Sequence, residues 1–393
     1  HGQGTYFMID STRPWKTQDP APPDSFGIGN VVIMDMMNGM PEGQFQMRYV
    51  TSTAANGGWD ATGVTAAYHM KLICDYFSNT LGRASIDGQG MNAVCNIHLG
   101  SNYANAFWEP GLKMIFFGDG DGVMFSSLAG SLDVMAHEFQ HGVTSHTANL
   151  EYQMQSGALN EGYSDFFGCM VDRDDWLMGE DTTLMAPYIM RNLPSPHDGL
   201  ESDMMEQQGL GPQPAHMNEY INVSLDQDHG GVHMNCTIPG RAGYLLAEGL
   251  SAEGLGTSIG REKAEQIWYR ALTTYLTRTS DFAAGARGHL QAAEELYGAD
   301  SAEAQAVAAA WNAVGVAAGT AGEPTPDPVD PVQGDDRLIF TFLNTDNQTY
   351  LGIVGWGSLG LIVVGAVVLT AVRWRRSPDD FVPWPAPRDL PTR

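Results

Sequence analysis

The segment HEFQH at residues 137–141 combines the residue types of a zinc site. On a helix, His137 and His141 project from one face, so their imidazoles can bind one zinc ion. Glu138 stands beside them, where its carboxylate could hold the metal-bound water instead of the metal. The plainer alternative is a helix with two histidines that face solvent. The spacing therefore indicates a catalytic zinc site, provided that another segment of the chain supplies a third ligand.

A catalytic zinc needs a third protein ligand and one open position. The segment SGALNEGYSDFFG, at 156–168, predicts a second helix on which Glu161 and Asp165 lie one turn apart. Glu161 could complete a site of two histidines and one glutamate. Asp165 could accept the free ring N–H of a ligand histidine, for which His137 is the candidate.

The elements that must position these residues change along the chain. Short apolar runs punctuated by Gly, Pro and Asn predict strands and loops in the first half, among them residues 93–99 and 113–117. Apolar positions near a 3.6-residue period predict helices at 62–80, 131–146, 156–172, 233–248, 261–276, 281–297 and 302–314. A β-rich first half and a helical second half indicate an α+β fold.

Composition narrows the classes of function. The chain has 393 residues, 43% of them apolar, which suits a folded protein with a substantial core. Its 46 acidic and 20 basic residues give a formal net charge of −26, which disfavours nucleic acid as a partner. Four cysteines without a Cys-x-x-Cys pair leave open three disulfide pairings or free buried thiols.

The C-terminal region has a different character. Residues 351–372 carry no charge over 22 positions and precede Arg373, Arg375 and Arg376, which predicts a transmembrane helix with a cytoplasmic tail at 373–393. The Pro/Asp-rich stretch before it is expected to form a linker, 317–350. We therefore expect an exported, extracytoplasmic protein anchored by one span. The order of Pro-rich linker, apolar segment and Arg cluster also resembles a bacterial C-terminal sorting signal. In that case the anchor would be removed after export.

Taken together, these motifs resemble the thermolysin family of zinc metalloendopeptidases over roughly residues 5–316. Nineteen residues separate HEFQH from Glu161, and the segments ANAFW (104–108), GDGDG (118–122) and DHGGVHMN (228–235) also match. The resemblance implies a two-domain zincin, with a β-rich domain at 1–149, a helical domain at 150–316 and the active-site cleft between them. It also implies an N-terminal pro-segment and protein or peptide substrates.

The resemblance assigns roles to individual residues. It makes His137, His141 and Glu161 the ligands of one catalytic zinc and Glu138 the general base. It makes His233 and Tyr152 donors to the oxyanion, and Asp228 the residue that orients His233. It places the substrate against Asn105, Ala106, Arg191, Val134 and Met190, the last two lining a pocket that favours cleavage on the N-terminal side of bulky hydrophobic residues.

A structural calcium site is expected next to the zinc-binding helix. The resemblance places four carboxylates there, those of Asp133, Asp172, Asp175 and Glu180, and such a cluster would repel without a cation. The loop after Asp172 is shorter than the family pattern and has Leu177 in place of an acid. We therefore expect one calcium ion and not two.

Two other functions fit parts of this pattern. One is a catalytically silent thermolysin-like module, tethered to the membrane, that only binds its partners. The intact Glu138, His233 and Tyr152 argue against a silent copy. The other is a zinc aminopeptidase, which the nineteen-residue spacing disfavours.

Overall fold

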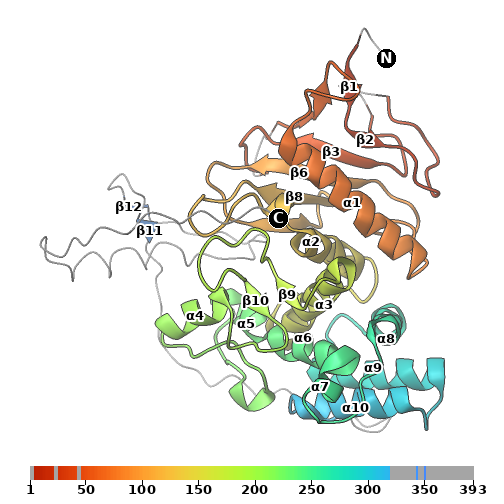
Figure 1. The fold of residues 1–393 in the computed structure, drawn as a ribbon, viewed down its shortest axis with the longest axis vertical. Helices are drawn as coiled ribbons and strands as arrows, with labels where there is room; N and C mark the ends of the chain where they lie inside the picture. The colour runs from red at the N-terminus through yellow and green to blue at the C-terminus, as the bar shows by residue number, and fades with distance from the viewer. Residues whose placement is uncertain (1–3, 22–24, 42–45, 319–341, 344–348, 351–393) are drawn as a thin grey trace, which may run out of the picture. The chain divides into compact units, whose positions relative to one another are not determined.

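The computed structural model describes residues 4–21, 25–41, 46–318, 342–343 and 349–350. The first part of the chain forms a six-stranded mixed sheet, and the helices of the second part lie below it in Figure 1. The sheet runs in the order β2-β3-β6-β8-β7, with β4 also paired to β3. Its strands are β2 (Ile9–Asp10), β3 (Val31–Asp35), β4 (Arg48–Tyr49), β6 (Ala93–Leu99), β7 (Ala106–Glu109) and β8 (Met114–Gly118).

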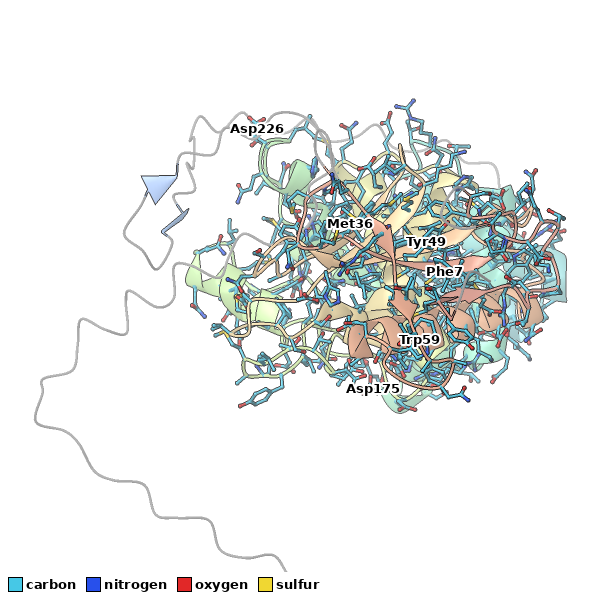
Figure 2. All side chains as sticks on the ribbon, turned by 90° about the horizontal axis from the view of Figure 1, so that it is seen from above. Phe7, Met36, Tyr49, Trp59, Asp175 and Asp226 are labelled. Atoms are coloured by element: carbon cyan, nitrogen blue, oxygen red, sulfur yellow. The ribbon has the colours of Figure 1, made fainter. Side chains whose placement is uncertain are left out.

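The centre of the sheet is parallel and buried. Strand β3 pairs in parallel with β6, and β6 pairs in parallel with β8. All five residues of β3 are buried, as expected for a strand with both faces covered. A separate antiparallel pair, β1 (Tyr6–Phe7) with β5 (Thr51–Ser52), brings Phe7 edge-on to Tyr49, with 5.4 Å between ring centroids (Figure 2).

Helix α1 (Ala61–Asn79) covers the sheet, packing against β3 and β6. Its N-terminus is capped by Asp60, whose Oδ1 accepts the N–H of Gly63 at 2.8 Å. The apolar stripe expected from the sequence, at Val64, Tyr68, Leu72, Tyr76 and Phe77, is wrong in part, because Val64 and Tyr68 are exposed. The buried face of the helix instead contains Met70, Ile73 and Phe77. The helix predicted at 62–80 is therefore confirmed to within one residue at each end.

Two helices form the centre of the molecule. Helix α2 (Leu132–Ser145) packs along α3 (Met154–Asp172), and both are almost entirely buried. In Figure 1 they lie between the sheet and the remaining helices. A strand pair, β9 (Leu177–Met178) with β10 (Arg191–Asn192), follows α3. Burial on all sides fixes the orientation of α2 and α3, which is what a metal site on their surfaces requires.

The rest of the described chain is mainly helical. It contains α4 (Leu200–Gln207), α5 (Asp228–Asn235), α6 (Thr237–Tyr244), a π-helical turn (Leu245–Gly249), α7 (Leu250–Ala252), α8 (Arg261–Thr274), α9 (Phe282–Tyr297) and α10 (Ala302–Ala313). Short 3₁₀ turns lie at Leu128–Gly130 and Met217–Glu219. A further strand pair joins β11 (Phe342–Leu343) to β12 (Thr349–Tyr350).

The expected α+β architecture is confirmed, but one helix differs from its prediction. The single helix expected at 233–248 is divided at Cys236 and ends in the π-helical turn. Pro239 has no N–H to donate to the carbonyl of Asn235, so the regular helical hydrogen bonds are interrupted there. Helix α4 was not predicted at all.

The four cysteines are buried and free, so none of the three possible disulfide pairings is present. The predicted transmembrane helix at 351–372 and the tail at 373–393 lie outside the described residues, as does most of the linker at 317–350. Among the residues that the structure does describe, no helix combines the length and apolar character needed to cross a membrane.

Candidate metal centre and active site

The packing of α2 against α3 brings three side chains to one point. The Nε2 atoms of His137 and His141 lie 3.0 Å apart. The carboxylate of Glu161 faces both, with Oε2 at 3.3 Å from the Nε2 of His137 and Oε1 at 3.3 Å from the Nε2 of His141. Helical spacing explains the two histidines, because residues four apart share a face.

The outer nitrogens of both histidines are already occupied. The Nδ1 of His137 lies 2.9 Å from Oδ1 of Asp165, and the Nδ1 of His141 lies 3.0 Å from Oδ1 of Asn160. With each Nδ1–H donated to an oxygen, both rings are in the tautomer that leaves Nε2 to bind a metal. Two Nε2 atoms this close to each other and to Glu161 suit a shared cation. Their separation is close to the roughly 3.3 Å that two nitrogens span on tetrahedral zinc.

Glu161 has the properties of an anionic ligand. Its side chain is fully buried, and Oε2 has no hydrogen-bond partner. Burial favours the neutral acid, but the charges of His233 and His141 outweigh it and hold the pKa of Glu161 well below its usual range. A buried carboxylate with an open oxygen beside two imidazole lone pairs fits a zinc ion, so the residues present match the predicted metal.

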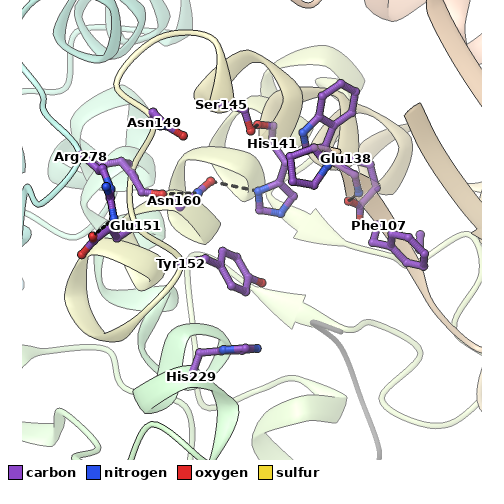
Figure 3. Close-up of a pocket in the computed structure, with 14 residues that line it drawn as sticks. Phe107, Glu138, His141, Ser145, Asn149, Glu151, Tyr152, Asn160, His229 and Arg278 are labelled. Atoms are coloured by element: carbon purple, nitrogen blue, oxygen red, sulfur yellow. Dashed lines mark hydrogen bonds and ion pairs between the residues drawn. The ribbon is translucent and has the colours of Figure 1, made fainter. Parts of the chain in front are cut away.

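Glu138 lies next to this centre and also faces a cavity. Its carboxylate comes within 4.8 Å of the nitrogens of His137 and His141, and Oε2 accepts the backbone N–H of Trp108 at 3.1 Å. It lines a cavity of about 370 Å³, as do His141 and Tyr152 (Figure 3). Burial raises the pKa of Glu138, opposed by the charges of the two histidines. Its place on the cavity wall suits a group that exchanges protons with a substrate.

A third segment brings His233 to the same centre. Four successive residues from Asp228 to Gly231 have positive φ angles, and a Cβ on Gly230 would lie 2.8 Å from the side chain of Met154. This turn allows the carboxylate of Asp228 to accept both the backbone N–H and the ring Nδ1–H of His233. Burial opposes protonation of His233, but Asp228 and Glu161 raise its pKa to about 9.

Tyr152 connects His233 with the metal centre. Its hydroxyl lies 3.0 Å from Nε2 of His233 and donates to Oε1 of Glu161. Burial, reinforced by the charge of Glu161, raises the pKa of Tyr152 well above its usual range, so the hydroxyl keeps its proton. Two side chains that can donate hydrogen bonds thus stand side by side at the edge of the centre, and their role as oxyanion donors stays a prediction.

Arg191 lies deeper than its expected role suggests. It is 1% exposed, and its Nε and Nη2 donate to the two carboxylate oxygens of Asp165 at 2.8 and 2.6 Å. Its Nη1 donates to Oε1 of Glu201 at 2.9 Å. Asp165 therefore contacts both His137 and Arg191. The predicted contact of Arg191 with substrate stays a prediction.

The other expected substrate-binding residues surround the centre. Ala106 lines the cavity, and the carboxamide oxygen of Asn105 accepts the N–H of Ala106 at 2.9 Å. Val134 lies one turn before His137 on α2, and Met190 directly precedes Arg191; both are buried. Their roles in holding substrate remain predictions.

A carboxylate cluster lies at the start of α2 and the end of α3. Asp133, Asp172 and Glu180 place their oxygens within 4.8 Å of one another. Burial and mutual repulsion raise the pKa of Asp172 to about 6 and that of Glu180 to about 8. Asp175 lies outside this trio; its Oδ1 accepts the N–H of Leu177 at 2.7 Å, and its charge helps to raise the pKa values of Asp172 and Glu180. Its part in a calcium site stays a prediction. Three acids held together fit one calcium ion.

Several residues of the site were missed from the sequence. Asn160 orients His141, Asp181 contributes negative charge near Asp133 and Asp172, and Glu201 binds Arg191. Asn160 directly precedes Glu161, and its position one residue before a ligand was the available signal. Asp181 directly follows Glu180. Nothing in the sequence distinguishes Glu201 from the other acids.

Comparison with known families matches both halves of the chain. Residues 1–145 match the thermolysin metallopeptidase catalytic domain, and residues 148–316 match the thermolysin metallopeptidase alpha-helical domain. The chain is 36% identical to the solved precursor of protealysin, a metalloproteinase from Serratia proteamaculans. That structure superposes with a TM-score of 0.60 over 74% of this chain and 89% of the other.

Individual relatives show the same likeness. The chain is 44% identical to a bacillolysin of Brevibacillus brevis over 268 residues, 67% of this chain and 48% of that protein. It is 38% identical to the neutral protease NprE of Bacillus pumilus over 315 residues, 80% of this chain and 92% of that protein. The chain thus spans about half the length of some curated relatives and most of another.

Proposed function

The chain belongs to the thermolysin metallopeptidase family, and from this premise we propose that it is a zinc metalloendopeptidase acting on proteins or peptides. One observation carries the proposal. His137, His141 and Glu161 direct ligand atoms at a single point, and Glu138 stands beside that point on the wall of a cavity. A chain that only binds partners has no use for a carboxylate in that position.

His137, His141 and Glu161 would hold the zinc. When bound, zinc lowers the pKa of a water molecule at its open position to about 7 and polarises the substrate carbonyl. Glu138 accepts the proton of the attacking water and delivers it to the departing amine. The backbone N–H of Trp108 keeps the Glu138 carboxylate turned toward the cavity.

His233 and Tyr152 act on the negative charge that develops on the carbonyl oxygen. Each presents a hydrogen-bond donor at the edge of the site, and Asp228 fixes the ring of His233 through Nδ1. One such donor typically lowers the barrier by about 3 kcal/mol. Asp165 fixes the tautomer of His137 in the same way.

The substrate backbone would be held by Asn105, by the carbonyl of Ala106 and by Arg191. Val134, one turn before His137 on α2, and Met190, directly before Arg191, are buried apolar residues, and we propose that they accept the side chain that follows the cut. A buried apolar pocket favours bulky hydrophobic residues there.

We also propose that the protein acts outside the cytoplasm, in keeping with a relative that is named an extracellular elastase. The apolar segment at 351–372 would tether it to a membrane through the Pro/Asp-rich linker. The solved relative is a precursor, which agrees with the expected pro-segment. One calcium ion would occupy the carboxylate trio of Asp133, Asp172 and Glu180.

Cleavage of a peptide library tests the proposal. We expect internal cuts directly before large apolar residues, at equal rates for free and N-acetylated peptides. A zinc chelator such as 1,10-phenanthroline should abolish cleavage, and added zinc should restore it. Removal of single N-terminal residues from free peptides only would indicate an aminopeptidase, and no cleavage of any peptide would contradict the proposed function.

A further inference from the structure

A buried polar network lies beneath the proposed active site. Its first part is the ion pair of Arg191 with Asp165, which also binds the ring of the zinc ligand His137. Glu201, on α4, adds a second carboxylate to the same guanidinium. Arg191 therefore has acidic partners on two sides and is held in one orientation.

Gln213 extends the network to the oxyanion side of the site. Its Nε2 donates to Oε2 of Glu201 at 3.0 Å and to the backbone carbonyl of His233 at 3.1 Å. An amide nitrogen has two N–H groups, so it can serve both acceptors. The backbone N–H of Gln213 is itself bound by Oγ of Ser202 at 3.1 Å, which ties the Gln213 segment to α4.

A continuous path therefore joins the zinc ligand to the oxyanion donor. Its members come from α2, α3, β10, α4, the segment after α4 and α5, and all of them are buried: His137, Asp165, Arg191, Glu201, Gln213 and His233. Arg191 and His233 are 42 positions apart in sequence. Within this path, the contacts made by Glu201 and Gln213 fix the distance between Arg191 and His233.

Burying the Glu201 carboxylate costs desolvation free energy that an apolar side chain at the same position would not. The charge of Arg191 is already matched by Asp165, and a second buried carboxylate carries its own desolvation penalty. Burial raises the pKa of Glu201, opposed by Arg191. The other buried residues of α4 include Leu200, Met204 and Met205, so an apolar side chain would suit the same face.

We propose that Glu201 and Gln213 are positioning residues that hold Arg191 and His233 in register, so that both groups engage one substrate. This inference rests on the proposed peptidase function. Glu201 acts through Arg191 on substrate binding. Gln213 acts through the backbone of His233 on the transition state.

The test compares two Glu→Gln variants on one helix. Glu201→Gln removes the charge that holds Arg191, while Glu206→Gln alters an exposed residue of α4 and serves as the control. We expect Glu201→Gln to raise KM on the order of tenfold, since displacement of a substrate-holding group by about 1 Å can cost as much as 100-fold. Glu206→Gln should leave kcat and KM unchanged.

A readout without catalysis separates positioning from turnover. Each substitution is combined with Glu138→Gln, which should stop cleavage, and the Kd of an uncleaved peptide is measured. Glu201→Gln should raise this Kd about tenfold at unchanged zinc content, and Glu206→Gln should not. If Glu201→Gln binds peptide as tightly as the control does, the positioning role of Glu201 is wrong.

Gln213→Leu provides an independent variant that leaves the contact between Glu201 and Arg191 in place. It removes the hydrogen bond to the backbone carbonyl of His233. We therefore expect kcat to fall about tenfold and KM to change less. A purely structural role predicts a lower melting temperature with both constants unchanged.

Two outcomes separate this inference from the proposed function. If the unmodified protein cleaves no peptide, the proposed function fails. If it cleaves peptides and these variants have the same kcat and KM, only this inference fails.

Discussion

Replacing Glu138 by Gln is expected to reduce kcat by a factor on the order of 10³ while zinc stays bound. The amide keeps the volume of the side chain, and its oxygen can still accept the N–H of Trp108. It cannot take a proton from water or return one to the leaving amine. The three residues that face the metal point are untouched, so zinc content measured by mass spectrometry should equal that of the unmodified protein.

His141→Ala is the matching change for the metal itself. It removes one of the two converging Nε2 atoms, so we expect both zinc and hydrolysis to be lost. Comparing the two variants separates loss of the proton-transfer step, in Glu138→Gln, from loss of the metal, in His141→Ala. Wild-type cleavage of casein by the Glu138→Gln protein would overturn the mechanism. A silent binding module would show no cleavage before any substitution.

Removal of calcium is expected to lower the melting temperature by roughly 5–10 °C. An ion present at about 100 times its Kd adds about 2.7 kcal/mol of stability, and 1 kcal/mol corresponds to about 2–4 °C in a protein of this size class. The structural reason is the trio of Asp133, Asp172 and Glu180, whose oxygens lie within 4.8 Å of one another.

The pH dependence of this effect has a definite sign. The folded protein without calcium keeps protons on Asp172 and Glu180 up to a higher pH than the unfolded chain does, because their pKa values are raised to about 6 and about 8. Stability contributed by these acids is therefore present at low pH and is lost as pH rises toward about 8. Bound calcium removes this loss, so melting curves with calcium and with chelator should diverge between pH 5 and pH 8.

Two controls make the calcium test specific. Calcium added back to the chelated protein should restore the melting temperature, whereas zinc alone should not. Glu180→Gln should weaken the response to calcium, while Asp203→Asn, at an exposed position of α4, should preserve it. Identical melting curves with and without calcium would rule out a bound structural cation.

The sequence predicted the features that depend on local spacing. His137, Glu138 and His141 lie within five residues on one helix, and Glu161 is fixed by the next helix along the chain. Helical periodicity positions such residues reliably, because the apolar stripe that buries α2 and α3 also orients their polar side chains.

Other features could not be predicted because they depend on contacts between distant segments. Glu201 and Gln213 meet Arg191 and His233 only after α4 and the segment following it have packed, and no periodic pattern marks them. The burial of Arg191 between Asp165 and Glu201 was not predicted, and its expected contact with substrate stays a prediction. Asp175 was expected with the calcium trio; one of its oxygens accepts the N–H of Leu177, a contact that no sequence pattern marks, and its role in a calcium site stays a prediction.

Crystallographic anomalous scattering at the zinc absorption edge tests the central claim most directly. The account predicts a single strong peak bonded to Nε2 of His137, Nε2 of His141 and the carboxylate of Glu161, at about 2.0–2.2 Å from each. Glu138 should lie beside it without bonding to it. A peak elsewhere, or a zinc-saturated crystal in which these three side chains bind no metal, would contradict the account.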